Sequence, residues 1–447
     1  MAKQTAQEKY IEMTTAPVER LIARLAVPTI ISMLITTIYN MADTFFIGMI
    51  STAASGAVGV SFSIMAIIQA LGFFFGQGAG ASISQALGSQ DTKRANELAA
   101  TGFFSALICG AGVGVLGLAF MKPLVYFLGA TETIYPHCVA YLRLILIGAP
   151  WMCASFVLNN LLRFEGNAFR AMVGLTTGGV LNMALDPLFI FVFDMGIAGA
   201  ALATIVSQAV SFGILLFQIK KYSAISIRFR DFRPGVRMYS AITRAGLPSL
   251  LRQGIASVGT ICLNTAARPF GDAAISAMAI IGRITMFSNS AMLGFGQGFQ
   301  PVCGFNYGAK RYDRVKKGYF FLIKTSVIGL LIFAAVEFGF AEQFVGIFRD
   351  DPAVIAIGAK ALRFQCITLV LNSFIISSNM LLQTTGQVVP ASILGVARHA
   401  FLIPCLWIFT GLFDLTGLQM SQPIADALTF LIAIPMAVRF LRKLGKD

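Results

Sequence analysis

The chain has 447 residues, of which 57% are hydrophobic and only 12% are charged, and its formal net charge is +14. A soluble domain carries about 25% charged residues, so this chain lacks the polar surface that a water-soluble protein of its length needs. The basic residues are spread between long apolar runs rather than gathered in one patch, which argues against a nucleic-acid partner.

The first nineteen residues are polar and mixed in charge, with Lys3, Glu8, Lys9 and Glu12 among them. They contain no short apolar core followed by a cleavage site of small residues, so a cleaved signal peptide is not expected. We interpret residues 1–19 as a cytoplasmic tail.

About twelve apolar runs follow the tail, and each is long enough for the roughly 20 residues that a transmembrane helix needs. They lie near 20–47, 56–84, 98–121, 137–161, 168–193, 196–219, 241–268, 274–303, 318–341, 355–381, 389–412 and 418–440. Because lipid cannot hydrogen-bond the backbone, these runs are expected to be helices. The sequence therefore predicts an all-α integral membrane protein with about twelve transmembrane helices.

Basic residues gather at alternate ends of these runs. One side holds Arg20, Arg24, Lys93, Arg94, the 220–237 segment, Lys310, Arg311, Arg314, Lys316, Lys317, Arg439, Arg442, Lys443 and Lys446. The other side is sparse in charge and often acidic, with Asp194, Glu342, Asp350, Asp351 and Asp414. Loops rich in Lys and Arg stay in the cytoplasm, so both termini are predicted to be cytoplasmic, which requires an even number of spans.

The second half of the chain repeats the first at an offset of 220 residues. Pro28 matches Pro248, and Phe75-Gly76-Gln77-Gly78 reappears as Phe295-Gly296-Gln297-Gly298. Each half holds six runs, so the repeat is parallel and its two-fold axis lies along the membrane normal. We predict a six-helix N-lobe at 20–220, a basic linker at 221–240, a six-helix C-lobe at 241–440 and a cytoplasmic tail at 441–447. The two lobes would enclose a central cavity.

Two acidic residues of the first half lie in or near apolar runs, where charge is costly and usually functional. Asp43 is late in the first run, and Asp186 follows Asn182 by four residues, on the same helical face. Pro187 frees a backbone carbonyl one turn earlier. Such an oxygen-rich cluster suits H⁺ or Na⁺ rather than a thiophilic metal. The structural alternatives are that Asp43 is solvated at the membrane surface and that Asp186 belongs to a helix end.

The acidic cluster has no counterpart in the second half, because Asp43, Asn182 and Asp186 correspond to Leu263, Leu402 and Leu406. Ion coupling is therefore expected to be asymmetric. Other charged residues near apolar runs are less informative. Snorkelling towards the membrane surface would explain Arg252 and Glu337, whereas the roles of Arg283 and Asp426 stay open.

Several classes of function find no support in the sequence. The seven cysteines and two histidines are scattered, so no metal cofactor is expected. No GxxxxGK[ST] motif occurs, which argues against ATP-driven transport. Asp350-Asp351 is the only adjacent acidic pair in the chain, and it lies in a predicted loop on the side that is poor in basic residues. This argues against a prenyl transferase, which would need clustered aspartates to hold Mg²⁺ on a diphosphate. A transporter without a bound cofactor is the better interpretation.

The chain resembles the multidrug and toxin extrusion (MATE) family over nearly its full length. The matching residues are Pro28 with Asp43, Ala86-Leu87-Gly88 with Asp91, Asn182-x3-Asp186-Pro187, the stretch from Gly196 to Thr204 and the loop Phe305–Ala309. The resemblance implies an antiporter that exports amphipathic, often cationic compounds by alternating access, driven by H⁺ or Na⁺. A flippase for a lipid-linked sugar or another amphipathic lipid is the alternative.

The resemblance also assigns roles to single residues. It implies that Asp43, Asn182, Asp186 and Thr204 form a cation site, that Tyr39, Tyr141 and Asn159 face the cavity, and that the first helix bends near Pro28. It further implies that the protein belongs to the bacterial drug-exporter branch of the family. Such a protein would work as a monomer and contact lipid in the inner membrane of a bacterium.

Overall fold

The computed structural model describes residues 5–445, with only the backbone of Thr52, and all of its regular structure is helical. The long helices of the N-lobe are α2 (Val18–Gly48), α3 (Thr52–Gly88), α4 (Thr92–Ala119), α6 (Tyr135–Phe164), α7 (Ala168–Pro187) and α8 (Gly196–Tyr222). Those of the C-lobe are α9 (Val236–Ala267), α10 (Asp272–Gly308), α11 (Tyr312–Gly339), α13 (Pro352–Leu369), α14 (Leu371–Thr384) and α15 (Val388–Lys443). Short helices are α1 (Ala6–Thr15), α5 (Met121–Phe127), α12 (Ala341–Phe348), η1 (Leu188–Val192), η2 (Phe229–Asp231) and η3 (Arg268–Phe270).

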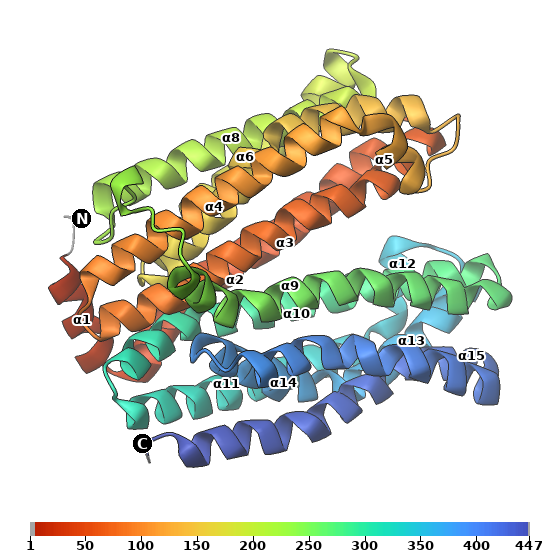
Figure 1. Cartoon of the computed structure of the whole chain (residues 1–447). Helices are drawn as coiled ribbons and strands as arrows, with labels where there is room; N and C mark the ends of the chain where they lie inside the picture. Colours follow the sequence, from red (N-terminus) through yellow and green to blue (C-terminus); the bar gives the residue numbers. More distant parts are fainter. Residues whose placement is uncertain (1–4, 446–447) are drawn as a thin grey trace.

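Nine helices in the described part of the chain are long and apolar enough to cross a membrane. One of them, α15, is two helices joined by non-helical residues at Phe413 and Asp414, and Figure 1 shows it turning back there. The helices α9 and α10 are less apolar, but with 32 and 37 residues they are long enough to cross. These additions bring the number of crossings to twelve, with α13 and the adjoining α14 counted as one, so the predicted all-α transmembrane fold is confirmed.

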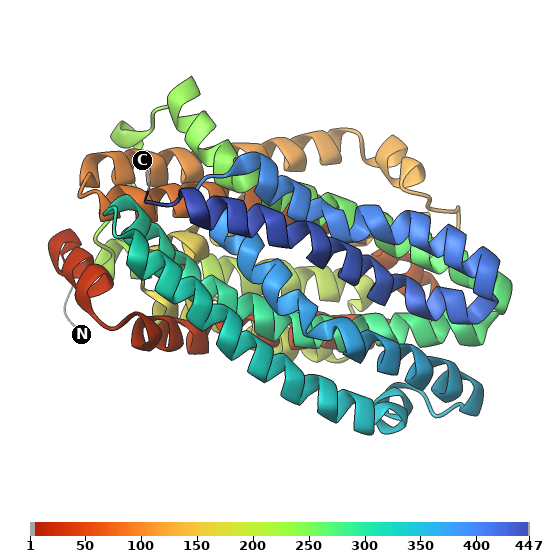
Figure 2. The same cartoon turned by 90° about the horizontal axis from the view of Figure 1, so that it is seen from below.

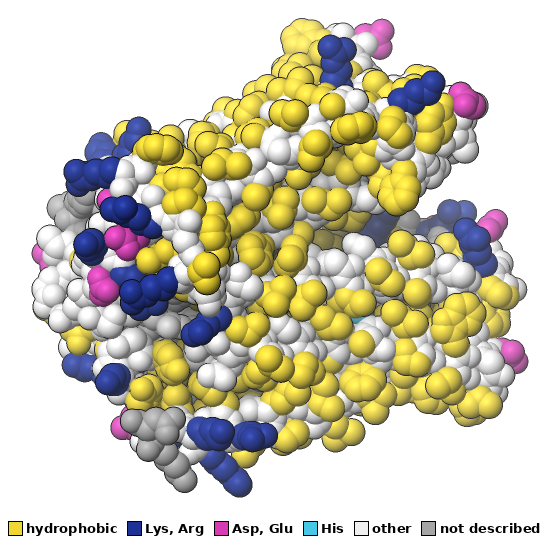
Figure 3. Space-filling view, viewed as in Figure 1, with side chains coloured by type: hydrophobic (Ala, Val, Ile, Leu, Met, Phe, Trp, Pro, Cys, Tyr) yellow, Lys and Arg dark blue, Asp and Glu magenta, His cyan; other side chains and the backbone are white. Residues whose placement is uncertain are grey.

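The long helices run along a roughly common axis in two bundles, as the two views in Figures 1 and 2 show. Both termini lie at the same end of the molecule, called the terminal end below. The space-filling view in Figure 3 shows a hollow between the lobes at the opposite end, while the lobes are in contact at the terminal end. The structure is therefore closed at the terminal end and open at the other.

Glycines allow the lobes to meet closely at the terminal end. A Cβ atom on Gly88 of α3 would lie 2.2 Å from the carbonyl oxygen of Phe305 in α10, and one on Gly308 would lie 2.1 Å from that of Gln85. These contacts are equivalent under the repeat, since both pairs of positions differ by 220. A side chain at either glycine would hold the two backbones apart, so only glycine permits this closure.

The predicted N-terminal tail contains a helix that packs against the protein. Residues 1–4 lie outside the described part of the chain, but α1 begins with a capping box between Thr5 and Glu8. Lys9 is 4% exposed and donates a hydrogen bond from its Nζ to Asn167 Oδ1 of the N-lobe at 2.9 Å. The Asn306 amide of the C-lobe donates to the Met13 carbonyl oxygen at 3.0 Å. The helix α1 therefore contacts both lobes.

The segment that joins the lobes offers a way to test the orientation of the protein in the membrane. The residues between α8 and α9, 223–235, are shorter than the predicted linker but contain Arg228, Arg230 and Arg233. Because basic loops remain in the cytoplasm, a cysteine that replaces the exposed Arg228 should react with an impermeant maleimide in inside-out vesicles only. Labelling in intact cells would contradict the predicted cytoplasmic termini.

Candidate cation site

Two helices of the N-lobe, α2 and α7, bring the predicted site residues together. A Cβ atom on Gly179 of α7 would lie 2.9 Å from Cδ1 of Tyr39 in α2, so the helices touch at this level. The helices α2 and α7 are the first and fifth spans of the N-lobe, and successive spans alternate in direction, so these two run in the same direction. Asp43 lies one turn beyond Tyr39, and Asn182 lies about one turn beyond Gly179. Parallel register therefore places Asp43 at the level of Asn182.

Asn182 links three of the predicted residues within the N-lobe. Its Nδ2 donates to Asp186 Oδ1 at 3.2 Å and approaches Thr204 Oγ1 of α8 at 3.5 Å. The exposed fractions of Asn182, Asp186 and Thr204 are 4%, 0% and 7%. Asp186 is the next-to-last residue of α7, as the helix-end alternative expects, but its side chain is fully buried.

Each carboxylate of the site retains an unsatisfied oxygen. Asp43 Oδ1 and Asp186 Oδ2 are buried and have no hydrogen-bond partner among the described residues. Buried polar atoms without a partner are uncommon and call for an explanation. A proton or a hard cation would supply the missing partner, and the donors present are carboxylate, amide and hydroxyl groups. No group of three or more His, Cys, Asp or Glu side chains that could hold a metal ion occurs in residues 5–445.

The residues predicted to face the cavity have different surroundings. Tyr39 is half-buried, and its ring packs against Gly179 of α7, which places it beside the site. Tyr141 is fully buried in the N-lobe, and its hydroxyl donates to Met65 Sδ at 3.3 Å. Asn159 donates from Nδ2 to the Ala171 carbonyl oxygen at 3.0 Å. Asn159 therefore ties α6 to α7 in this conformation.

Pro28 lies inside an unbroken helix. The helix α2 contains 31 residues, and hydroxyl groups bond to the carbonyl oxygens around the proline. Ser32 Oγ donates to the Pro28 carbonyl oxygen at 2.9 Å, and Thr29 Oγ1 donates to that of Gly294 in the C-lobe at 2.6 Å. Pro28 therefore lies where α2 meets the other lobe, and α2 is not broken there in this conformation.

The C-lobe contains a polar cluster that the sequence did not reveal. Asp426 is fully buried and pairs with Arg398 Nε at 2.6 Å, while Gln365 Nε2 donates to it at 2.7 Å. Glu337 is 6% exposed and accepts a hydrogen bond from Ser288 Oγ at 2.5 Å, so the snorkelling interpretation of Glu337 is wrong. Asp426 carries its own internal counter-charge, which distinguishes it from the acids of the N-lobe.

A buried arginine at the contact between the lobes was also missed. Arg163 of α6 is 2% exposed and donates to Gln300 Oε1 at 2.8 Å and to the Gln297 carbonyl oxygen at 3.0 Å, both in α10. Its NH2 also donates to Asn160 Oδ1 of the same helix at 2.6 Å. The role of Arg163 was not apparent from the sequence, because all of these partners are neutral and two of them lie in the other lobe. Arg252, for which snorkelling was expected, instead directs NH1 towards Asn379 Oδ1 at 3.4 Å.

The positions equivalent to the cation site in the C-lobe are apolar and buried. Leu263, Leu402 and Leu406 are 7%, 5% and 0% exposed. The repeat therefore preserves the packing of these helices but not the carboxylates.

The chain was compared with known proteins. The sequence profile of the MatE family matches residues 28–188 and again residues 248–408, two stretches that are offset by the same 220 positions as the repeat. The multidrug export protein MepA of Staphylococcus saprophyticus is 28% identical over 411 residues, which cover 92% of this chain and 91% of that protein.

Solved structures match over the whole length of the chain. One is an outward-facing conformation of a multidrug resistance MATE family transporter of the MOP superfamily, with a TM-score of 0.93, 27% identity and 100% of both chains covered. Another, a MOP superfamily transporter from Pyrococcus furiosus, has the same TM-score, identity and coverage, and its description states that reversed polarity of its binding pocket suggests a different function. The two matches of the family profile cover more than half of the chain, and the chain is therefore a member of the MatE family of membrane transporters.

Proposed function

We propose that this protein exports amphipathic, often cationic compounds in exchange for H⁺ or Na⁺, which binds at Asp43, Asn182, Asp186 and Thr204. The observation that carries the proposal is the pair of unsatisfied, buried carboxylate oxygens on Asp43 and Asp186. Membership of a family of cation-coupled antiporters and the similarity to a protein named for multidrug export support it.

The open hollow and the closed terminal end fit one state of an alternating-access cycle (Figure 3). With cytoplasmic termini, the hollow faces outwards, where drug leaves and the coupling ion enters. A ligand shifts such an equilibrium only by its different affinity for the two states. Ion binding near α2 and α7 would change how α2 packs, and would thereby oppose drug binding.

A gradient assay on purified protein in liposomes tests the proposal. Ethidium should be transported when a pH gradient or a Na⁺ gradient is imposed, and collapse of the effective gradient should stop transport. Transport that persists without either ion gradient, or that follows a lipid-linked sugar instead, would refute the antiport proposal and favour the flippase alternative. We further propose that the protein works as a monomer in a bacterial inner membrane.

Pro28→Ala should slow transport while ethidium binding is retained. Alanine restores the backbone hydrogen bond that proline lacks and stiffens α2, whereas the carboxylates stay in place. The readouts are the initial rate of efflux and the equilibrium affinity for ethidium. Wild-type rates across the pH range would exclude bending of α2 from the cycle.

A further inference from the structure

A cavity of about 440 Å³ lies between the lobes at the terminal end. The N-lobe contributes Gln85 and Arg94 to its lining, and the C-lobe contributes Arg244, Tyr307 and Lys310. Among the residues 5–445 that line it, none has an acidic side chain. The cavity therefore joins both lobes around a set of positive charges.

The three cations that line this cavity have no partner in the described part of the chain. Within residues 5–445, no ion pair, hydrogen bond or ring contact involves the side chains of Arg94, Arg244 or Lys310. By contrast, the described Asp and Glu side chains at this end of the molecule that form ion pairs bind other residues: Glu12 pairs with Arg24, and Glu19 pairs with Lys317. Three unpaired cations around one cavity form a site for an anion.

The internal repeat relates the arginines of this cavity to a second pair of arginines, which the N-terminal segment of the chain contacts. Arg244 and Arg94 correspond to Arg24 and Arg314. There the helix α1 occupies the equivalent place: Glu12 Oε1 lies 2.5 Å from Arg24 NH2, and the Ala16 carbonyl oxygen accepts a hydrogen bond from Arg314. The site at Arg24 and Arg314 thus binds a carboxylate and a carbonyl oxygen. The described part of the chain supplies no such group to the cavity at Arg244 and Arg94.

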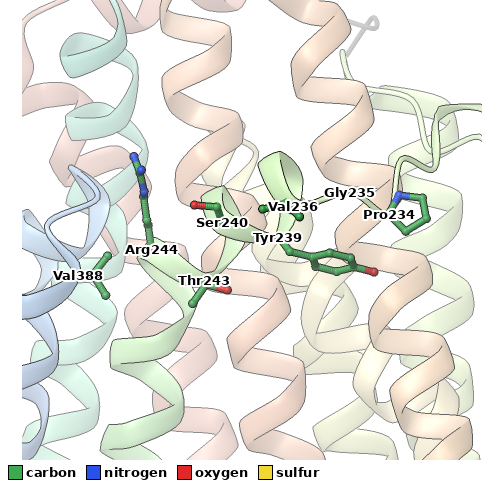
Figure 4. A pocket seen from close by; sticks show the side chains of 8 residues that line it. All are labelled: Pro234, Gly235, Val236, Tyr239, Ser240, Thr243, Arg244 and Val388. Carbon is green, nitrogen blue, oxygen red and sulfur yellow. The ribbon is translucent and has the colours of Figure 1, made fainter.

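A second, more apolar cavity of about 670 Å³ shares Arg244 with the first. Pro234, Val236, Tyr239 and Val388 line it, and Figure 4 shows Val388 reaching it from a second helix. Val236 is 88% exposed. A cationic cavity that continues into an apolar one suits an amphiphile with an anionic head.

We propose that the two cavities bind one anionic phospholipid of the cytoplasmic leaflet, with its phosphate among Arg94, Arg244 and Lys310 and its glycerol and acyl groups along Val236 and Val388. Basic pockets between transmembrane helices on the cytoplasmic side commonly hold anionic headgroups. Both lobes supply cations, so the bound lipid stabilises the conformation that is closed at the terminal end. This proposal depends on the predicted cytoplasmic orientation but not on the coupling ion.

Native mass spectrometry and thermal unfolding of the purified protein test the proposal. Phosphatidylglycerol should be retained and should raise the Tm more than phosphatidylcholine does. In Arg94→Gln/Arg244→Gln the apparent affinity for phosphatidylglycerol should fall about thirtyfold, since each basic residue contributes about a factor of five. The size-exclusion profile should be unchanged, because the side chains of Arg94 and Arg244 are exposed and their replacement leaves no gap in the packed core.

A matched control separates the pocket from general surface charge. Lys220→Gln/Arg228→Gln removes two exposed basic residues that do not line either cavity, and it should bind phosphatidylglycerol like the wild type. An equal loss in this control, or wild-type retention of lipid in the pocket variant, would overturn the site. Equal protection by inorganic phosphate at the same concentration would overturn the lipid and leave a soluble anion as the ligand.

Discussion

Asp186→Asn should reduce ion-driven ethidium efflux to the rate of passive leak while leaving the protein folded. Asparagine has nearly the shape of aspartate and can still hydrogen-bond Asn182, so the fully buried position should remain packed. It cannot take up a proton or neutralise a cation, and a transporter without that exchangeable charge loses its coupling. The readouts are efflux in liposomes under an imposed ion gradient and the Tm of the purified variant.

The repeat supplies the matched control for this experiment. Leu406→Asn places the same residue at the equivalent position of the C-lobe, which is also fully buried. A polar group in an apolar core costs stability, so the Tm should fall, but the dependence of efflux on the ion should persist. If both variants lose ion dependence equally, the coupling site does not lie in the N-lobe.

Gly88→Ala should shift the transporter away from the conformation closed at the terminal end. The added Cβ atom would lie 2.2 Å from the Phe305 carbonyl oxygen, and backbone cannot move aside as a flexible side chain could. Overpacking of this kind costs about 1–3 kcal/mol, which corresponds to a shift of about 5- to 150-fold in the equilibrium between two conformations. Labelling of Cys303, which is 1% exposed, by a maleimide should accelerate accordingly.

Gly112→Ala is the control for Gly88→Ala, because nothing lies within 4 Å of a Cβ atom at that position of α4. It should leave the labelling of Cys303 and the rate of efflux unchanged. If Gly88→Ala labels no faster than Gly112→Ala, then the glycine contact does not hold the lobes together. The symmetry-related Gly308→Ala should behave like Gly88→Ala, since its Cβ atom would meet the Gln85 carbonyl oxygen.

Most of the fold could be predicted because its dominant constraint is local. A run of apolar residues long enough to span a bilayer must be helical whatever lies beside it. The repeat then fixed the grouping into two lobes. The helix α1 was not expected as a packed element, because its attachment to Asn167 and Asn306 depends on contacts between segments far apart in the chain.

The candidate site was predictable in part for a similar reason. Spacing alone places Asn182 and Asp186 on one face of a helix, and their hydrogen bond follows from it. The network around Asp426 was not predictable, because Arg398 and Gln365 reach it from separate segments. The side chain of Glu337 looked accessible from its place near a helix end, yet tertiary packing buries it beside Ser288.

The gap-free register between the halves has a consequence for the ancestry of the chain. A family profile that matches twice at a constant offset indicates duplication and fusion of a single six-helix unit. Two identical units that pair must carry every mutation twice, whereas a fused pair can change one copy alone. Fusion thus allowed the first copy to acquire Asp43 and Asp186 at positions where the second copy has leucines. The same freedom gave one copy the leading helix α1 and left the equivalent surface of its sister without one.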